Sequence, residues 1–88
     1  MQYIEAIIKG RVQGVFFRAQ TQKKALNLNI KGSVSNLNDG CVKVIAGGKE
    51  SSIKQLLAWL QHGPSLARVD EVNYKIIPAF NSDSFIIK

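Results

Sequence analysis

The chain has 88 residues but contains a single cysteine, Cys41, and a single histidine, His62. One cysteine cannot form a disulfide within the chain, and the two residues are too few for a zinc site built from cysteines or several histidines. Chains this short often rely on such cross-links because their cores are small. The fold must therefore rest on the packing of regular elements, and we expect one domain that spans residues 1–88.

Apolar alternation predicts a first strand at residues 3–9, where the even-numbered side chains are apolar. Four further strands are expected, at residues 30–36, 40–46, 67–77 and 84–87. The Asp39-Gly40 pair between the first two of these is typical of a tight hairpin turn. We expect Gly47-Gly48 to break the strand that follows this turn.

Two segments predict helices. Residues 18–28 are good helix formers. Residues 49–61 place four apolar side chains at i, i+3, i+4 and i+7, which are Ile53, Leu56, Leu57 and Leu60. The resulting order predicts an α+β fold of the ferredoxin-like type, βαββαβ with a short extra C-terminal strand. In this α/β sandwich an antiparallel sheet carries both helices on one face.

The net charge of +6 favours anionic partners such as nucleic acid, a membrane surface or a phosphorylated small molecule. The longest basic run is Lys23-Lys24, so the chain lacks the basic stripe of a dedicated nucleic-acid binder. The sequence shows no signal-peptide pattern and no apolar stretch of the ~20 residues that span a bilayer. We therefore expect a cytoplasmic protein without a dedicated nucleic-acid partner or a membrane partner.

The segment from Gly10 to Arg18 joins the first strand to the first helix and has the features of an anion site. Consecutive N–H groups of a glycine-containing loop can form a concave nest, and the first helical turn adds unpaired N–H groups. Gly14 can adopt positive φ at little cost. The Arg18 guanidinium could bind two phosphate oxygens at once. By spacing alone, however, the segment is equally compatible with an ordinary turn beside an exposed arginine.

The residues themselves are more specific than their spacing. The run GRVQGVFFR at residues 10–18 resembles the signature loop of the acylphosphatase family. Residues 32–42 resemble the family's second motif, around its catalytic asparagine, and residues 63–69 are similar to the run that follows its second helix. The resemblance covers essentially the whole chain. Ser33 and Ser35 depart from it, since they stand where the family most often has tryptophan and frequently has a basic residue.

This resemblance implies a hydrolase that cleaves the carboxyl–phosphate bond of acyl phosphates without a metal or another cofactor. Arg18 would bind the phosphate and Asn36 would position the attacking water. Backbone N–H groups would also bind the phosphate, from Gln13, Gly14, Val15, Phe16 and Phe17. The implied partners are a small-molecule acyl phosphate and, as product or inhibitor, inorganic phosphate or a similar anion. The protein is expected to act as a monomer.

Two alternatives on the same topology remain open. A single-stranded RNA-binding module needs exposed aromatic side chains on its two central strands. Those strands are expected at residues 3–9 and 40–46, where Tyr3 is the one aromatic residue. A non-catalytic phosphate-binding domain would keep the loop without the activity, and the presence of both Arg18 and Asn36 favours an enzyme instead.

The remaining conspicuous side chains are interpreted as structural. Phe16 and Phe17 lie at a strand–helix junction, where adjacent aromatic residues are typical of a core. Trp59 lies beside the apolar stripe of the second helix and is expected to pack there. Cys41 has no histidine near it in the sequence, which favours a small structural residue over a nucleophile.

Overall fold

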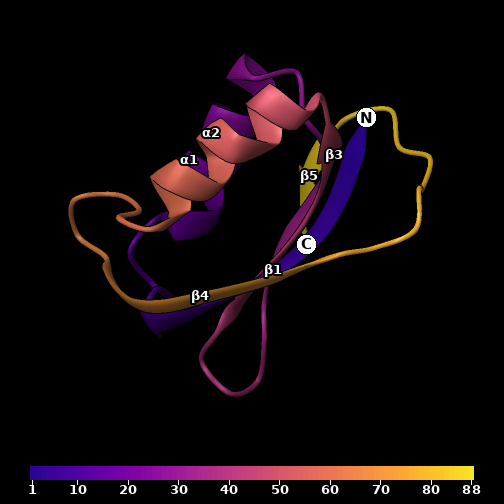
Figure 1. Ribbon diagram of the computed structural model, residues 1–88. Helices are drawn as coiled ribbons and strands as arrows, with labels where there is room; N and C mark the ends of the chain where they lie inside the picture. Colours follow the sequence, from indigo (N-terminus) through magenta and orange to yellow (C-terminus); the bar gives the residue numbers. More distant parts are fainter.

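Two helices lie side by side on one face of a five-stranded sheet in the computed structural model, which describes residues 1–88 (Figure 1). The elements are β1 (Gln2–Arg11), α1 (Phe17–Asn27), β2 (Lys31–Asn36), β3 (Val42–Gly48), α2 (Glu50–Leu60), β4 (Arg68–Ile76) and β5 (Phe85–Ile87). The strand order in the sheet is β4-β1-β3-β2-β5. This arrangement confirms the predicted ferredoxin-like fold and places β1 and β3 among the inner strands, as expected.

The edge formed by β5 differs from the prediction of a wholly antiparallel sheet. β5 pairs with β2 in parallel, with Gly32 opposite Phe85, whereas the other three strand pairs are antiparallel. β4 runs opposite to β2, and the chain reverses once between residues 77 and 84 as it crosses to the far edge. Because of that single reversal, β5 runs in the same direction as β2, and the sheet is mixed.

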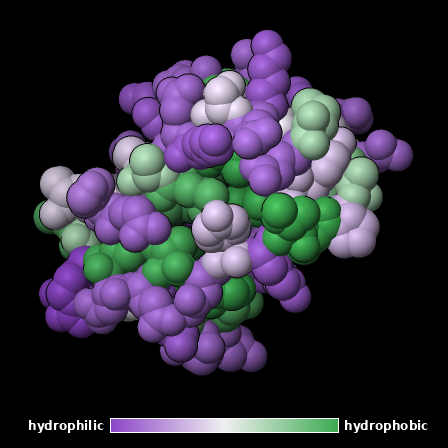
Figure 2. All heavy atoms as spheres, in the orientation of Figure 1, coloured by the Kyte–Doolittle hydropathy of each residue, from purple (hydrophilic) through white to green (hydrophobic).

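The core lies between the sheet and the helices and contains 16 buried apolar residues. From β1, Ile4, Ala6 and Ile8 are fully buried, which confirms the predicted alternation. The predicted stripe of α2 faces the same layer, with three of its four residues fully buried and the fourth partly buried. Figure 2, in the orientation of Figure 1, shows hydrophobic residues in a band between hydrophilic ones on the face turned to the viewer.

Neither helix has the length and apolar character needed to cross a membrane.

The predicted strand break at Gly47-Gly48 is wrong, because both glycines belong to β3. Gly47 pairs with Tyr3 of β1 on one side and with Lys31 of β2 on the other. A Cβ atom at residue 47 would lie 2.6 Å from the ring of Tyr3, which also packs edge-on against Phe80 at 5.1 Å between centroids. Glycine is therefore placed here to make room for an aromatic ring, and the strand continues through it.

The junction between β1 and α1 places two adjacent phenylalanines in different environments. Phe17 is 1% exposed and its ring lies 5.9 Å from that of Trp59, so its expected core position is confirmed. Phe16 is 72% exposed, so the expected core position is wrong for this residue. The reason is its backbone, since Phe16 has φ +62° in the left-handed region, where the chain turns sharply before the helix begins.

Replacing these two residues separates their contributions to stability. Phe17→Ala should lower the free energy of unfolding by about 3–5 kcal/mol, because it leaves a cavity in the core under α1. Phe16→Ala should change it by no more than about 0.5 kcal/mol, because the lost ring is mostly in solvent. Urea denaturation of both variants measures the difference. Equal destabilisation by the two substitutions would contradict this description of the junction.

Candidate active site

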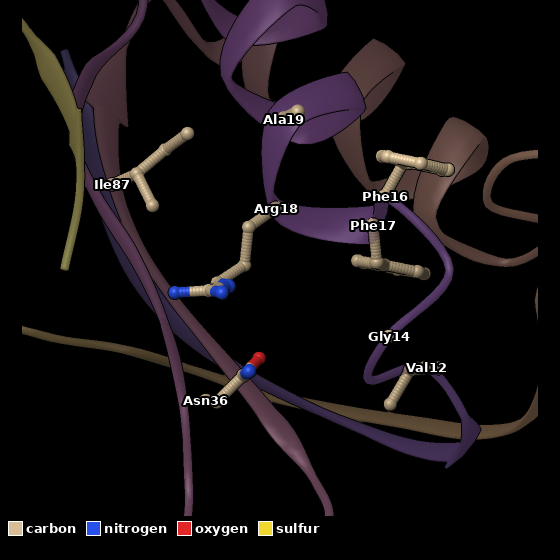
Figure 3. A pocket seen from close by; sticks show the side chains of 8 residues that line it. All are labelled: Val12, Gly14, Phe16, Phe17, Arg18, Ala19, Asn36 and Ile87. Carbon is tan, nitrogen blue, oxygen red and sulfur yellow. The ribbon is translucent and has the colours of Figure 1, made fainter.

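A hollow of about 270 Å³ lies where the β1–α1 loop, the first turn of α1, the end of β2 and β5 meet (Figure 3). It is lined by Val12, Gly14, Phe16, Phe17, Arg18, Ala19, Asn36 and Ile87. The fold thus brings together Arg18 and Asn36, which come from different elements. Their side chains point toward each other across the hollow (Figure 3).

The loop before α1 leaves its backbone donors unpaired. No N–H group from Gln13 to Ala19 donates to a backbone carbonyl, and none donates to a protein side chain. Gly14, at φ +74°, and Phe16 are both left-handed, and such residues curl a short loop into an anion-binding nest. The buried side chain of Val15 lies between them and holds the loop to the core. The loop is therefore anchored while its N–H groups stay available to a ligand.

The start of α1 adds to this set of donors. Phe16 at the N-cap makes no side-chain hydrogen bond to the helix, and the first turn contains no acidic residue. The unpaired N–H groups and the positive end of the helix dipole therefore have no partner within the protein. An anion bound at this point would supply the missing acceptors.

Arg18 lies in the first turn of α1 and points into the hollow (Figure 3). Its Nη1 donates to the main-chain oxygen of Lys88, the last residue of the chain, at 3.0 Å. None of the salt bridges to an acidic side chain involves this guanidinium. This one hydrogen bond orients the guanidinium. Because an arginine has five N–H donors, most of them remain available to a ligand.

Asn36 is the last residue of β2 and its side chain is exposed to solvent. Its amide group points toward the guanidinium of Arg18 (Figure 3) and makes no hydrogen bond to the protein. The strand ladder fixes its backbone, because Asn36 pairs with Val42 of β3. A strand thus presents a free amide, which can both donate and accept, at the wall of the hollow.

Two of the predicted phosphate-loop residues do not line the hollow. Val15 points its side chain into the core, and Gln13 uses its side-chain amide on the β2–β3 turn. The sequence interpretation missed three lining residues: Val12, Ala19 and Ile87. Val12 lies within the motif of residues 10–18 and Ala19 directly follows it, so the motif could have indicated both residues. Ile87 enters through the parallel pairing of β5, for which the sequence contains no local signal.

Arg18 is the one charged residue among those that line the hollow, so the site is electropositive. Cys41 lies outside it and is 7% exposed. Burial, together with the nearby Asp39 carboxylate, raises the pKa of the Cys41 thiol, which disfavours the reactive thiolate. A hydrogen bond from the Cys41 N–H lowers the pKa of Asp39 and holds the turn together.

No three histidine, cysteine or acidic side chains gather in a way that could hold a metal ion.

Comparison with known proteins matches residues 4–87 to the acylphosphatase family model. An acylphosphatase from Photobacterium profundum is 44% identical over 85 residues, which cover 97% of this chain and 94% of that protein. An acylphosphatase from Thermus thermophilus is 49% identical over 72 residues, or 82% of each chain. The solved structure of an acylphosphatase from Coxiella burnetii superposes with a TM-score of 0.96 at 39% identity and covers 99% of this chain and 92% of that one.

The family match contains both motifs, residues 10–18 and residues 32–42, and both contribute to the same hollow. The similarity also extends over most of the length of each relative, so it concerns whole proteins and not a shared fragment. The chain belongs to the acylphosphatase family, whose enzymes hydrolyse acyl phosphates.

Proposed function

We propose that the hollow beside α1 is where this chain hydrolyses the carboxyl–phosphate bond of acyl phosphates. Arg18 and the loop N–H groups from Gln13 to Phe17 bind the phosphoryl group, and Asn36 positions the attacking water. The observation that carries the proposal is the row of unpaired N–H groups at the uncapped start of α1, directly beside a guanidinium and a free amide.

The reaction needs few catalytic groups. Water attacks phosphorus, the bond between phosphorus and the acyl oxygen breaks, and that oxygen leaves with the bonding electrons as a carboxylate. A carboxylate is a weak base and departs without a general acid. The proton of the water passes to a phosphate oxygen, so the products are a carboxylate and inorganic phosphate. Phosphoryl transfer through a loose transition state then depends on positioning and on compensation of oxygen charge.

The residues of the hollow match these two needs. The guanidinium of Arg18 and the loop N–H groups compensate charge on the phosphoryl oxygens, and they are in place before the substrate arrives. The side-chain carbonyl of Asn36 can accept a hydrogen bond from water and hold its oxygen in line with the leaving group. Since the protein supplies the positive charge itself, we propose that the reaction requires no metal ion.

The rest of the hollow is apolar and suits the acyl part of the substrate. Val12, Phe16, Ala19 and Ile87 form this part of the wall (Figure 3). An acyl group that extends from a bound phosphate toward β5 would contact Ile87, which lies across the hollow from Val12 and Phe16 (Figure 3). We also propose that the monomer is the active unit.

The alternatives are less well supported. Tyr3, the aromatic residue expected on the inner strands, packs against Phe80 and over Gly47 and is only partly exposed. It is therefore poorly placed to stack on bases, which an RNA-binding module of this topology requires. A purely phosphate-binding domain would bind phosphate in the same hollow without turning over an acyl phosphate, so an activity assay distinguishes it from an enzyme.

Removing either proposed catalytic side chain should abolish most of the activity. Arg18→Ala and Asn36→Ala should each lower kcat/KM for benzoyl phosphate by at least about 10²-fold, because each removes a preorganised contact to the reacting groups. Arg11→Ala and Asn38→Ala are matched controls, since both residues are exposed and lie outside the hollow. A folded Arg18→Ala variant with near-normal turnover would overturn the proposal.

The same assay tests the proposed metal independence. Turnover of benzoyl phosphate should be unchanged after incubation with excess EDTA, because the guanidinium and the loop N–H groups supply the positive charge. Activity that disappears with the chelator and returns with added Mg²⁺ would show that a metal ion takes part.

The acyl wall can be tested at Ile87, which is 40% exposed and lines the hollow. Ile87→Ser should raise KM for benzoyl phosphate several-fold, because an apolar contact to the ring is lost. KM for acetyl phosphate should change by less than about twofold, since a methyl group reaches little of this wall. Equal changes for the two substrates would place the acyl group elsewhere.

A further inference from the structure

The side chain of Gln13 joins the two halves of the site. Its Nε2 donates both hydrogens, one to the carbonyl of Leu37 and one to the carbonyl of Cys41, each at 2.8 Å. Leu37 directly follows Asn36, and Cys41 lies at the other end of the β2–β3 turn. The amide of a loop residue thus reaches into the turn that carries the asparagine.

The other hydrogen bonds of this turn are internal to it. The Leu37 N–H donates to the Cys41 carbonyl at 2.8 Å, and the Gly40 N–H donates to the Leu37 carbonyl at 3.2 Å. The Cys41 N–H donates to the carboxylate of Asp39 at 3.0 Å. The Gln13 amide is therefore the hydrogen-bonding link between this turn and the loop before α1.

The position of this link matters because the sheet ladder ends there. Asn36 and Val42 form the last residue pair of β2 and β3. The ladder between β1 and β3 also ends at this level, because its last pair is Ile8 and Val42. Without Gln13, the end of β2 and the phosphate loop would each be fixed to the core, but no polar contact would fix one relative to the other.

We propose that Gln13 is a positioning residue that sets the placement of Asn36 relative to the phosphate loop. This inference rests on the proposed function, since it assumes that Asn36 holds the attacking water. An in-line attack is sensitive to small displacements, and a shift of about 1 Å can cost ~10²-fold in rate. A link across the two elements would keep the water on the line of attack without touching the substrate.

The first test compares Gln13→Met with the matched control Gln22→Ala. Methionine keeps the length and burial of the side chain but removes both donors. It should lower kcat for benzoyl phosphate by about 10-fold to 100-fold, with KM changed by less than about threefold. Gln22 is a half-buried glutamine whose Nε2 donates to the Phe85 carbonyl at 3.0 Å, away from the turn. Gln22→Ala should leave kcat within about twofold of the wild type.

The second test is a double-mutant cycle with Asn36. If Gln13 acts through Asn36, then Gln13→Met should have little further effect on kcat in the Asn36→Ala background. The same factor of loss in both backgrounds would overturn the inference, because Gln13 would then act on the phosphate loop itself. An unchanged kcat in the Gln13→Met single variant would also overturn it.

These results are distinguishable from a failure of the proposed function. If Asn36→Ala impairs turnover while Gln13→Met does not, the inference about Gln13 falls and the role of Asn36 stands. If Asn36→Ala keeps the wild-type kcat, the proposed role of the asparagine falls and the inference falls with it. Circular dichroism and urea denaturation of each variant establish that the changes in kcat occur in folded protein.

Discussion

Backbone N–H groups without an acceptor destabilise a folded chain unless water or a ligand pairs with them, and the β1–α1 loop holds a row of such groups. They persist because the loop cannot relax. Gly14 and Phe16 are held in left-handed conformations, while Val15 and Phe17 on either side of Phe16 are buried in the core. The same packing that stabilises the fold thus keeps the donors exposed, and a phosphoryl group would satisfy them.

The second half of the site depends on the sheet. β2 ends at Asn36, where it pairs with Val42 and the hairpin turn of residues 37–41 begins. The side chain of Gln13 connects this turn to the loop before α1. β5 then covers the outer edge of β2 and brings Ile87 to the hollow and the main-chain oxygen of Lys88 to Arg18. Three segments far apart in the sequence therefore meet at the start of one helix, and the fold determines their geometry.

Much of this could be predicted from local patterns. The apolar stripe of α2 and the alternation in β1 depend only on the periods of helix and strand, so the order of elements was readable. Arg18 and Asn36 were recognised because they lie in motifs with specific residues. Their sharing of one site was implied by the family resemblance, and the structure places both side chains at the same hollow.

The errors arose where contacts distant in sequence decide the outcome. The ring of Tyr3 occupies the space above Gly47, so β3 extends over both glycines and ends at Gly48 rather than before them. The parallel pairing of β5 depends on the crossing of residues 77–84 to the far edge, which no local pattern encodes. Phe16 is apolar but lies in a left-handed turn, where hydrophobicity alone does not place a side chain in the core.

In the proposed mechanism, unpaired loop N–H groups and Arg18 together bind the phosphoryl group. Titration of inorganic phosphate into ¹⁵N-labelled protein, followed by ¹H–¹⁵N correlation spectra, tests it most directly. We expect saturable shifts of the backbone amides from Gly14 to Arg18, and their loss in the Arg18→Ala variant. Shifts confined to other parts of the chain, or saturable loop shifts that persist unchanged without the Arg18 guanidinium, would contradict it.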